Sequence, residues 1–139
     1  MSQSINYIDL FAGAGGLSEG FIRAGFTPIA HVEMDKAACN TLLTRTVYHH
    51  LKDTPDFTKY ISYIKGDGIT REELYRLLPE NKRESVINLT IGDETNPEIF
   101  ERIDKLRGSK SIDLIIGGPP CQAYSLAGRS RDKNRMKDD

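Results

Sequence analysis

The 139 residues are 38% hydrophobic and 28% charged, which is typical of one small globular domain. The formal net charge of −1 argues against a large DNA-binding surface within the chain, because such surfaces are usually basic. No apolar run approaches the ~20 residues of a membrane helix, and the polar N-terminus does not resemble a signal peptide. We therefore expect a cytoplasmic protein with no membrane segment.

The first third of the chain alternates short apolar runs with helical spacing. Residues 5–11 predict a buried strand, which ends in the glycine-rich turn Ala12-Gly-Ala-Gly-Gly16 and a helix. Residues 28–32 predict a second strand. Asp35 then caps a helix expected from residue 36 to about residue 45. This order of strand, glycine turn, helix, strand and helix is typical of a doubly wound α/β sheet.

The rest of the chain predicts two further strands. Residues 46–82 are less regular and are interpreted as an insertion, although Thr70-Arg-Glu-Glu73 has the pattern of a capping box. Residues 85–91 predict a third strand, and residues 112–116 a fourth, central and parallel strand. Between them, Asn96 should cap a helix whose buried face consists of Ile99, Phe100, Ile103 and Leu106. We predict one Rossmann-like domain, with a mainly parallel sheet, that stops after the fourth main strand.

The glycine turn favours S-adenosylmethionine (SAM) over a dinucleotide. A NAD-type fingerprint that starts at Gly13 requires a third glycine at position 18, where this chain has Ser18. Glu33 lies about 20 residues beyond the glycines, at the end of the second predicted strand. A carboxylate at that place can accept hydrogen bonds from ribose hydroxyls.

The loop after the fourth strand, Gly117-Gly-Pro-Pro-Cys121, carries a candidate nucleophile. Proline fixes φ and removes a hydrogen-bond donor, so this loop should be stiff. Doubly wound proteins bind ligands at the carboxyl ends of their strands, which makes Cys121 a candidate for covalent catalysis. Cys39 is expected only to pack on a helix face. No Cys or His spacing predicts a metal site.

Three segments resemble motifs of the cytosine-5 DNA methyltransferases. Asp9-Leu-Phe-Ala-Gly-Ala-Gly-Gly-Leu17 resembles the first motif, His31-Val-Glu-Met-Asp35 the second, and Gly117-Gly-Pro-Pro-Cys-Gln-Ala-Tyr-Ser125 the fourth. They span nearly the whole chain in the family's order. The resemblance implies methyl transfer from SAM to C5 of cytosine in double-stranded DNA, through a covalent bond from Cys121 to C6 of a flipped-out base. Two alternatives remain: a tRNA cytosine-5 methyltransferase, and a non-catalytic SAM-binding module.

The resemblance also implies roles for single residues. Phe11 and Met34 should contact the adenine of SAM, and Glu33 its ribose. Pro119 should lie between cofactor and base. Backbone of the glycine turn should line the methionine part of the cofactor: Ala12, Gly13, Gly15, Gly16 and Leu17. The remaining loop residues should face the substrate: Pro120, Gln122 and Ser125.

Two acids compete for a contact with the adenine amino group. Asp67, in Lys65-Gly-Asp-Gly-Ile-Thr70, lies in a stretch that is more similar to the family's third motif letter by letter. Asp93 has the better topology, because a strand precedes it and a helix and the nucleophile strand follow it without a surplus element. We favour Asp93.

Several family elements are absent from these residues: the Glu-Asn-Val motif, a placed Arg-x-Arg motif, the later helix that closes the SAM pocket, and the domain that reads DNA. We therefore expect a fragment that needs a C-terminal half, is inactive alone and binds SAM weakly. Its unpaired sheet edge should allow self-association. In a complete enzyme, the basic residues between 129 and 137 would contact DNA phosphates.

Overall fold

A computed structural model describes residues 3–121. Its strands form one sheet of four strands, all parallel, in the order β3-β2-β1-β4. The bounds of the strands are β1 Asn6–Leu10, β2 Thr27–Val32, β3 Val86–Ile87 and β4 Leu114–Gly117. The predicted Rossmann-like arrangement is thereby confirmed.

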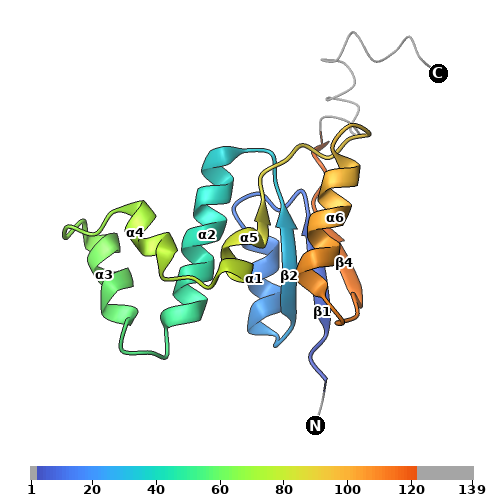
Figure 1. Ribbon diagram of the computed structural model, residues 1–139. Coiled ribbons are helices and arrows are strands. Elements are labelled where there is room, and N and C mark those ends of the chain that lie inside the picture. Colours follow the sequence, from blue (N-terminus) through green and yellow to red (C-terminus); the bar gives the residue numbers. More distant parts are fainter. Residues whose placement is uncertain (1–2, 122–139) are drawn as a thin grey trace.

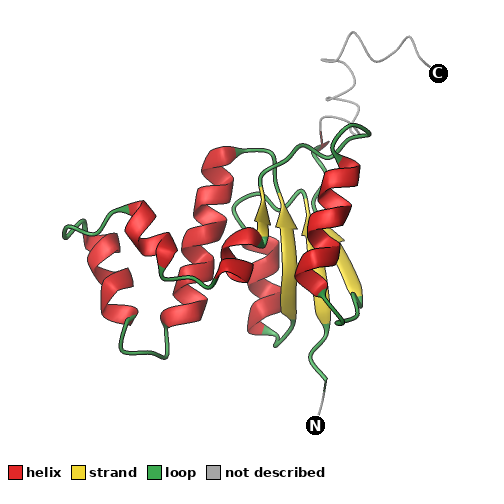
Figure 2. Cartoon of the chain, in the orientation of Figure 1, coloured by secondary structure: helices red, strands yellow, loops and turns green. Residues whose placement is uncertain are grey.

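Helices cover both faces of this sheet. Figure 1 shows α6 across the front of the sheet and α1 behind it, and α2 packs on the same face as α1. The small helices α3 and α4 pack on α2, away from the strands (Figure 2). The bounds of the helices are α1 Gly16–Arg23, α2 Lys36–Leu51, α3 Phe57–Lys65, α4 Arg71–Arg76, α5 Glu80–Glu84 and α6 Asn96–Arg107. Within residues 3–121, no helix combines the length and the apolar character needed to cross a membrane.

The strand order creates a switch point at the carboxyl end of β1. The chain leaves β1 towards β2 on one side, through α1, and returns on the other side as β4, through α6. Loops that diverge from two adjacent parallel strands leave a crevice between them, which is where such sheets bind ligands. The fold therefore places the glycine turn and the proline-cysteine loop at the same edge of the sheet.

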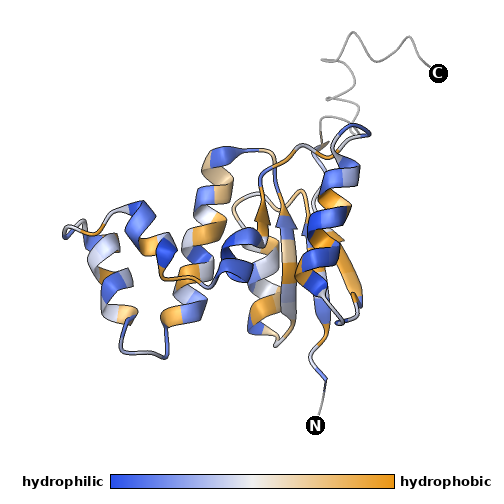
Figure 3. Cartoon of the chain, in the orientation of Figure 1, coloured by the Kyte–Doolittle hydropathy of each residue, from blue (hydrophilic) through white to orange (hydrophobic). Residues whose placement is uncertain are grey.

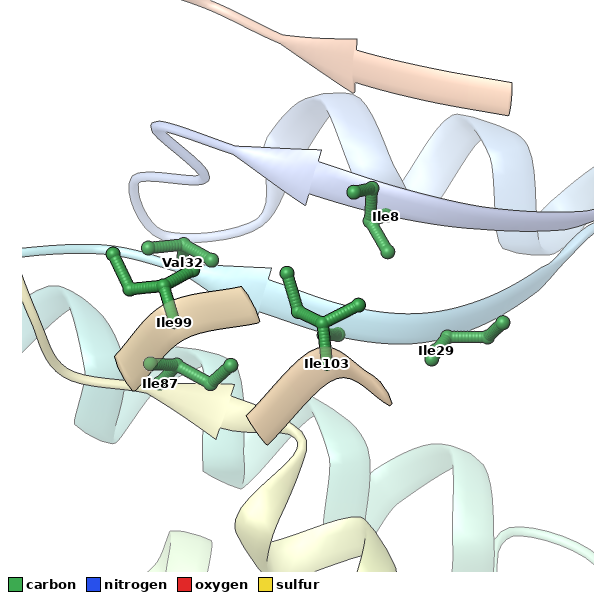
Figure 4. Packing of buried hydrophobic residues seen from close by; sticks show 7 residues of the cluster. Ile8, Ile29, Val32, Ile87, Ile99 and Ile103 are labelled. Atoms are coloured by element: carbon green, nitrogen blue, oxygen red, sulfur yellow. The ribbon is translucent and has the colours of Figure 1, made fainter. Parts of the chain in front are cut away.

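The face under α6 is an apolar core. Ile8, Val32 and Ile87 project from β1, β2 and β3 onto Ile99 and Ile103 of α6 (Figure 4). Each of these side chains is at most 6% exposed. Fully burying one aliphatic side chain stabilises a fold by about 1.5–3 kcal/mol, so this layer holds the sheet on α6.

The face under α1 is polar, although it is equally buried. The Tyr7 hydroxyl lies 2.6 Å from Ser18 Oγ, which lies 2.8 Å from Nε2 of His31. Burial lowers the pKa of His31 to about 4, so the imidazole is neutral at pH 7. Asp9 pairs in register with His31 on one side and with Ile116 on the other.

Asp9 is a buried carboxyl group without a hydrogen-bond partner. Its side chain is only 1% exposed, and among the described residues neither carboxylate oxygen has a partner. Burial, together with the nearby charge of Glu33, raises the pKa of Asp9 to about 6. The folded protein therefore keeps this carboxyl group protonated up to about pH 6, well above the range in which a free aspartic acid ionises.

The predicted helix after the second strand is longer than expected. Asp35 caps it as predicted, with its Oδ1 2.7 Å from the backbone nitrogen of Ala38, but α2 continues to Leu51 instead of ending near residue 45. The extension is stable because Val47 and Leu51 bury against α4. The Thr70–Glu73 capping box of α4 is confirmed. That residues 46–82 form an insertion stays a prediction.

Five other expectations need correction. The fourth strand is parallel as predicted, but within residues 3–121 it lies at the edge of the sheet rather than at its centre, because β4 pairs with β1 alone. The third strand ends at Ile87 rather than residue 91, and the fourth spans Leu114–Gly117 rather than residues 112–116. The residue that caps α6 is Thr95, one position before Asn96. Phe100 is 62% exposed, because α6 turns only its Ile99 and Ile103 side into the core. Figure 3 shows the resulting mixture of polar and apolar residues along α6.

Candidate active site

A cavity of about 640 Å³ opens at the carboxyl edge of the sheet. This volume suits a cofactor-sized ligand, since such pockets usually measure about 300–1,000 Å³. Ten residues at or after the carboxyl ends of the four strands line it: Phe11, Gly13, Val32, Glu33, Met34, Leu89, Thr90, Ile91, Gly118 and Pro120. The cavity thus lies at the switch point.

The glycine turn has strained backbone at the cavity wall. Phe11 has φ of 57°, a left-handed conformation that a bulky residue rarely adopts. A neighbouring hydrogen bond fixes this conformation: the backbone nitrogen of Ala12 donates to the Val32 carbonyl over 3.0 Å. Such outliers persist at ligand sites, where the surrounding structure over-determines them. The ring of Phe11 stays 37% exposed at the cavity.

Glu33 ties the end of β2 to the glycine turn. Its Oε2 accepts a hydrogen bond from the backbone nitrogen of Gly13 over 2.7 Å, and its Oε1 accepts one from Asp35 over 3.0 Å. Backbone donors to a carboxylate make strong, charge-assisted bonds. Each carboxylate oxygen has further acceptor capacity. The side chain is therefore fixed in direction and can still accept hydrogen bonds from a ligand.

The other residues predicted for the glycine turn do not line this cavity. Ala12 is buried beneath the turn against Leu42 of α2. Gly15 has φ of 89°, and a Cβ built there would lie 2.8 Å from Leu42 Cδ2. Gly16 begins α1, and Leu17 is 49% exposed. Ala12 and Gly15 let the turn lie close to α2, and the contact of all four residues with a cofactor stays a prediction.

The proline-cysteine loop forms the opposite wall. Gly118 and Pro120 line the cavity, whereas Pro119 is exposed outside its lining. Cys121 follows Pro120 directly, and it is exposed. Gln122 and Ser125, as well as the basic residues between 129 and 137, lie outside the described residues. The structure thus brings the candidate nucleophile next to the cavity without burying it.

The two competing acids lie in different parts of the molecule. Asp67 follows α3 and lines shallow depressions beside that helix. Asp93 is exposed in the turn before α6, two residues after the cavity-lining Ile91. Neither acid lines the cavity itself. The adenine contact proposed for Asp93 therefore stays a prediction.

Sequence reasoning missed the contribution of the segment after β3. Leu89, Thr90 and Ile91 line the cavity, although they were expected to continue a strand. Asn88 donates from Nδ2 to the carbonyl oxygens of Glu33 and Met34. A polar residue that interrupts the apolar run 86–91 was the available signal.

Cys39 behaves differently from Cys121. It is 2% exposed and donates its thiol to the Glu33 carbonyl over 3.3 Å, and burial raises the pKa of the Cys39 thiol. A buried thiol that is held protonated is a poor nucleophile. Within the part of the chain described here, no three His, Cys, Asp or Glu side chains form a group that could hold a metal ion.

A second cavity of about 290 Å³ lies beside α1 and the start of β2. Of the predicted site residues that the structure describes, only Gly15 lines it. The two cavities share no lining residue.

Comparison with known proteins identifies the family. The family model for C-5 cytosine-specific DNA methylases matches residues 5–71 and 74–139. The chain is 41% identical to the type II methyltransferase M.Bpa9945I of Bacillus paralicheniformis, over 95% of the chain and 34% of that protein. It is 29% identical to the putative type II methyltransferase M.MjaORF1200P of Methanocaldococcus jannaschii, over 94% of the chain and 39% of that protein.

A third relative is the type II methyltransferase M.AquIA of Picosynechococcus, which is 35% identical over 88% of the chain and 34% of its own length. The chain thus spans little more than a third of these curated relatives. No solved structure matches it significantly. On the family match over nearly its whole length, the chain belongs to the C-5 cytosine-specific DNA methylases.

Proposed function

We propose that the protein containing this chain transfers a methyl group from SAM to C5 of cytosine in double-stranded DNA. One observation carries the proposal: Cys121 is exposed directly after Pro120, which lines the same cavity as Phe11, Gly13 and Glu33. A nucleophile and a cofactor pocket that meet at a switch point are what a covalent methyl-transfer mechanism requires.

The residues of the cavity fit SAM. Glu33 presents an oriented carboxylate with acceptor capacity for ribose hydroxyls. Phe11 and Met34, the latter 67% exposed, offer apolar surface to an adenine ring. When bound, SAM supplies an electrophilic methyl group.

Cys121 would supply the covalent step. Its thiolate adds to C6 of cytosine, forming an S–C6 bond, and the electron pair of the C5–C6 double bond becomes available at C5. C5 would then take the methyl group as the bond from the methyl carbon to sulfur breaks, and S-adenosylhomocysteine would leave with that electron pair. Loss of the proton from C5 and expulsion of the Cys121 thiolate restore the aromatic ring. Splitting one difficult step into two easier steps is the general advantage of covalent catalysis.

The partners of the reaction would be duplex DNA and the rest of the enzyme. A cytosine inside a duplex must be flipped out to reach the cavity, at a cost of a few kcal/mol. β4 ends the sheet, and Ile115 on it is 61% exposed. This strand edge would receive the remaining catalytic domain or, in the isolated chain, a second copy. Alone, the chain would bind SAM weakly and lack turnover.

Covalent trapping tests the proposal. Residues 1–139 would replace the matching segment of M.Bpa9945I, and the hybrid would be incubated with SAM and duplex DNA containing 5-fluorocytosine. Fluorine at C5 cannot leave as a proton would, so the adduct between Cys121 and C6 should accumulate and survive denaturing electrophoresis.

Matched variants make the trapping experiment specific. Cys121→Ala should abolish the adduct, whereas Cys39→Ala should retain it. An adduct that persists in Cys121→Ala would contradict the proposed nucleophile. Trapping by 5-fluorocytosine RNA but not by DNA would instead support a tRNA methyltransferase. SAM binding without any adduct would support a non-catalytic module.

A further inference from the structure

The sheet opens at the cavity because β3 ends early. The parallel ladder between β2 and β3 runs through His31, whose nitrogen donates to the Ser85 carbonyl, and Glu33, whose nitrogen donates to the Ile87 carbonyl over 3.0 Å. Parallel ladders place such bonds at regular intervals. The next bond of this ladder would join the nitrogen of Leu89 to the carbonyl oxygen of Glu33.

That bond is replaced by a side chain. The nitrogen of Leu89 turns back to the Ile87 carbonyl over 3.1 Å, so the chain leaves the sheet and lines the cavity. The Nδ2 group of Asn88 takes the vacated place, 3.1 Å from the Glu33 carbonyl oxygen and 2.8 Å from that of Met34. The amide nitrogen of an asparagine has the two hydrogens that two carbonyl acceptors require.

The position of Glu33 depends on this amide. Its carboxylate accepts from the nitrogens of Gly13 and Asp35, while its carbonyl accepts from Asn88 and from the weak thiol donor of Cys39. Removing Asn88 would leave the Met34 carbonyl without this donor and the Glu33 carbonyl with the thiol alone. The backbone that directs the carboxylate would then be free to shift.

We propose that Asn88 is a positioning residue for the cofactor site, which holds the Glu33–Met34 backbone so that the Glu33 carboxylate can recognise ribose hydroxyls. The inference rests on the proposed role of Glu33 in SAM binding. It assigns to Asn88 no contact with the cofactor, only the direction of the residues that make one.

The first test needs no ligand. Amide hydrogen exchange would be measured by NMR on the 139-residue chain and on Asn88→Asp, which has the same shape but no amide donor. Gly13 and Asp35, whose nitrogens donate to Glu33, should exchange at least tenfold faster in the variant, since a tenfold change corresponds to about 1.4 kcal/mol of lost protection. The Glu19 amide, which donates to the Gly15 carbonyl in α1, should be unchanged.

The second test uses two probes: S-adenosylhomocysteine and an analogue that lacks both ribose hydroxyls. The chain should prefer the hydroxylated probe, and Asn88→Asp and Asn88→Ala should reduce this preference about tenfold, the size of one charged hydrogen bond. If the substitution only damaged the fold, it would weaken the binding of both probes equally and leave the preference unchanged.

Asn96→Asp is the matched control, because Asn96 uses its Oδ1 as an acceptor for the Gly92 nitrogen and an aspartate keeps that bond. It should leave the exchange of both amides and the probe preference unchanged. Unchanged exchange of the Gly13 and Asp35 amides in Asn88→Asp would overturn the positioning role. A different outcome would separate the two proposals. If Asn88→Asp alters amide exchange as expected but the wild-type chain binds both probes equally, the proposed role of Glu33 is refuted and the positioning of its backbone is not.

Discussion

The two walls of the cavity are stabilised in opposite ways. The glycine turn is bound from several directions: Glu33 accepts from Gly13 and Asp35, and Ala12 donates to the end of β2. On the other wall, Gly118 and Pro120 are exposed and follow the edge strand β4. The difference indicates that the chain by itself organises the cofactor wall, whereas the nucleophile wall depends more on what packs beside it.

The largest effect should come from the point where β4 touches β1. A Cβ built on Gly117 would overlap the carbonyl oxygen of Leu10, and this atom belongs to rigid backbone. Gly117→Ala should therefore separate the strands and lower the free energy of unfolding by more than about 4 kcal/mol. Gly118→Ala is the control, since its added Cβ has no neighbour within 4 Å. Equal urea midpoints for the two variants would contradict this account of the β4 anchor.

The next effect concerns Asp9, on the strand between the two walls. Because its pKa rises to about 6 on folding, the folded state binds more protons than the unfolded state between about pH 4 and pH 6. Stability from this group is present below pH 4 and lost as pH rises to about 6. Asp9→Asn should therefore be more stable than wild type at pH 7, by about 3 kcal/mol at most.

Urea unfolding between pH 4 and pH 8 measures the Asp9 effect. His31 contributes with the opposite sign, since its pKa is lowered to about 4 and its stability is lost as pH falls, so only the difference between variant and wild type is informative. Asp113→Asn serves as the control with reversed sign. Its carboxylate accepts from the Asn6 nitrogen and has a lowered pKa, so that variant should lose stability at pH 7. If Asp9→Asn is no more stable than wild type at pH 7, the description of Asp9 as a buried carboxyl group without a partner is wrong.

Glu33→Gln should have a smaller effect, confined to the cofactor wall. A glutamine has one oxygen for the two backbone donors of Gly13 and Asp35, so one bond is lost at about 1–2 kcal/mol. The variant also removes the charge of Glu33, which helps to raise the pKa of Asp9. An NMR titration should therefore show a lower pKa for Asp9 in the variant. Glu94→Gln, on the exposed turn before α6, should change neither quantity. An unchanged Asp9 titration in Glu33→Gln would argue against coupling between the two carboxyl groups.

The smallest effect on stability is expected at Cys121 itself. Because its side chain is exposed, Cys121→Ala should change the free energy of unfolding by less than about 0.5 kcal/mol. Cys39→Ala should cost about 1 kcal/mol or more, since Cys39 packs beside Ala12 and Leu42. Thermal unfolding of both variants checks this contrast. A large loss in Cys121→Ala would mean that the thiol is a structural part of its wall.

Local sequence signals predicted most of the fold. The predicted strands at residues 5–11 and 28–32 correspond to β1 and β2, and Asp35 caps α2 as expected. Errors occurred where tertiary packing overrides local preference. The run 85–91 is apolar enough for a strand, but its second half leaves the sheet because the Asn88 side chain satisfies the carbonyl that a ladder bond would otherwise reach.

For the site, the glycine spacing and the motif resemblance pointed to Phe11, Gly13, Glu33, Met34 and Pro120, and all five line the cavity. It could not distinguish residues that face a ligand from those that support the turn. Ala12 and Gly15 belong to the same motif, yet they pack against α2. A motif records which residue types a turn requires, but not the direction of each side chain.

By itself, the sequence determined the order of the strands along the chain, the two loops at their carboxyl ends and the cysteine that one of them carries, because these depend on local periodicity and on the backbone chemistry of glycine and proline. Only the tertiary structure decided that Glu33 bonds to Gly13 across the strands, that Asp9 is buried without a partner among the described residues, and that the Asn88 side chain replaces one hydrogen bond of the sheet. These features depend on contacts between residues 20 to 55 positions apart or on burial. Such contacts exist only when the sheet has assembled.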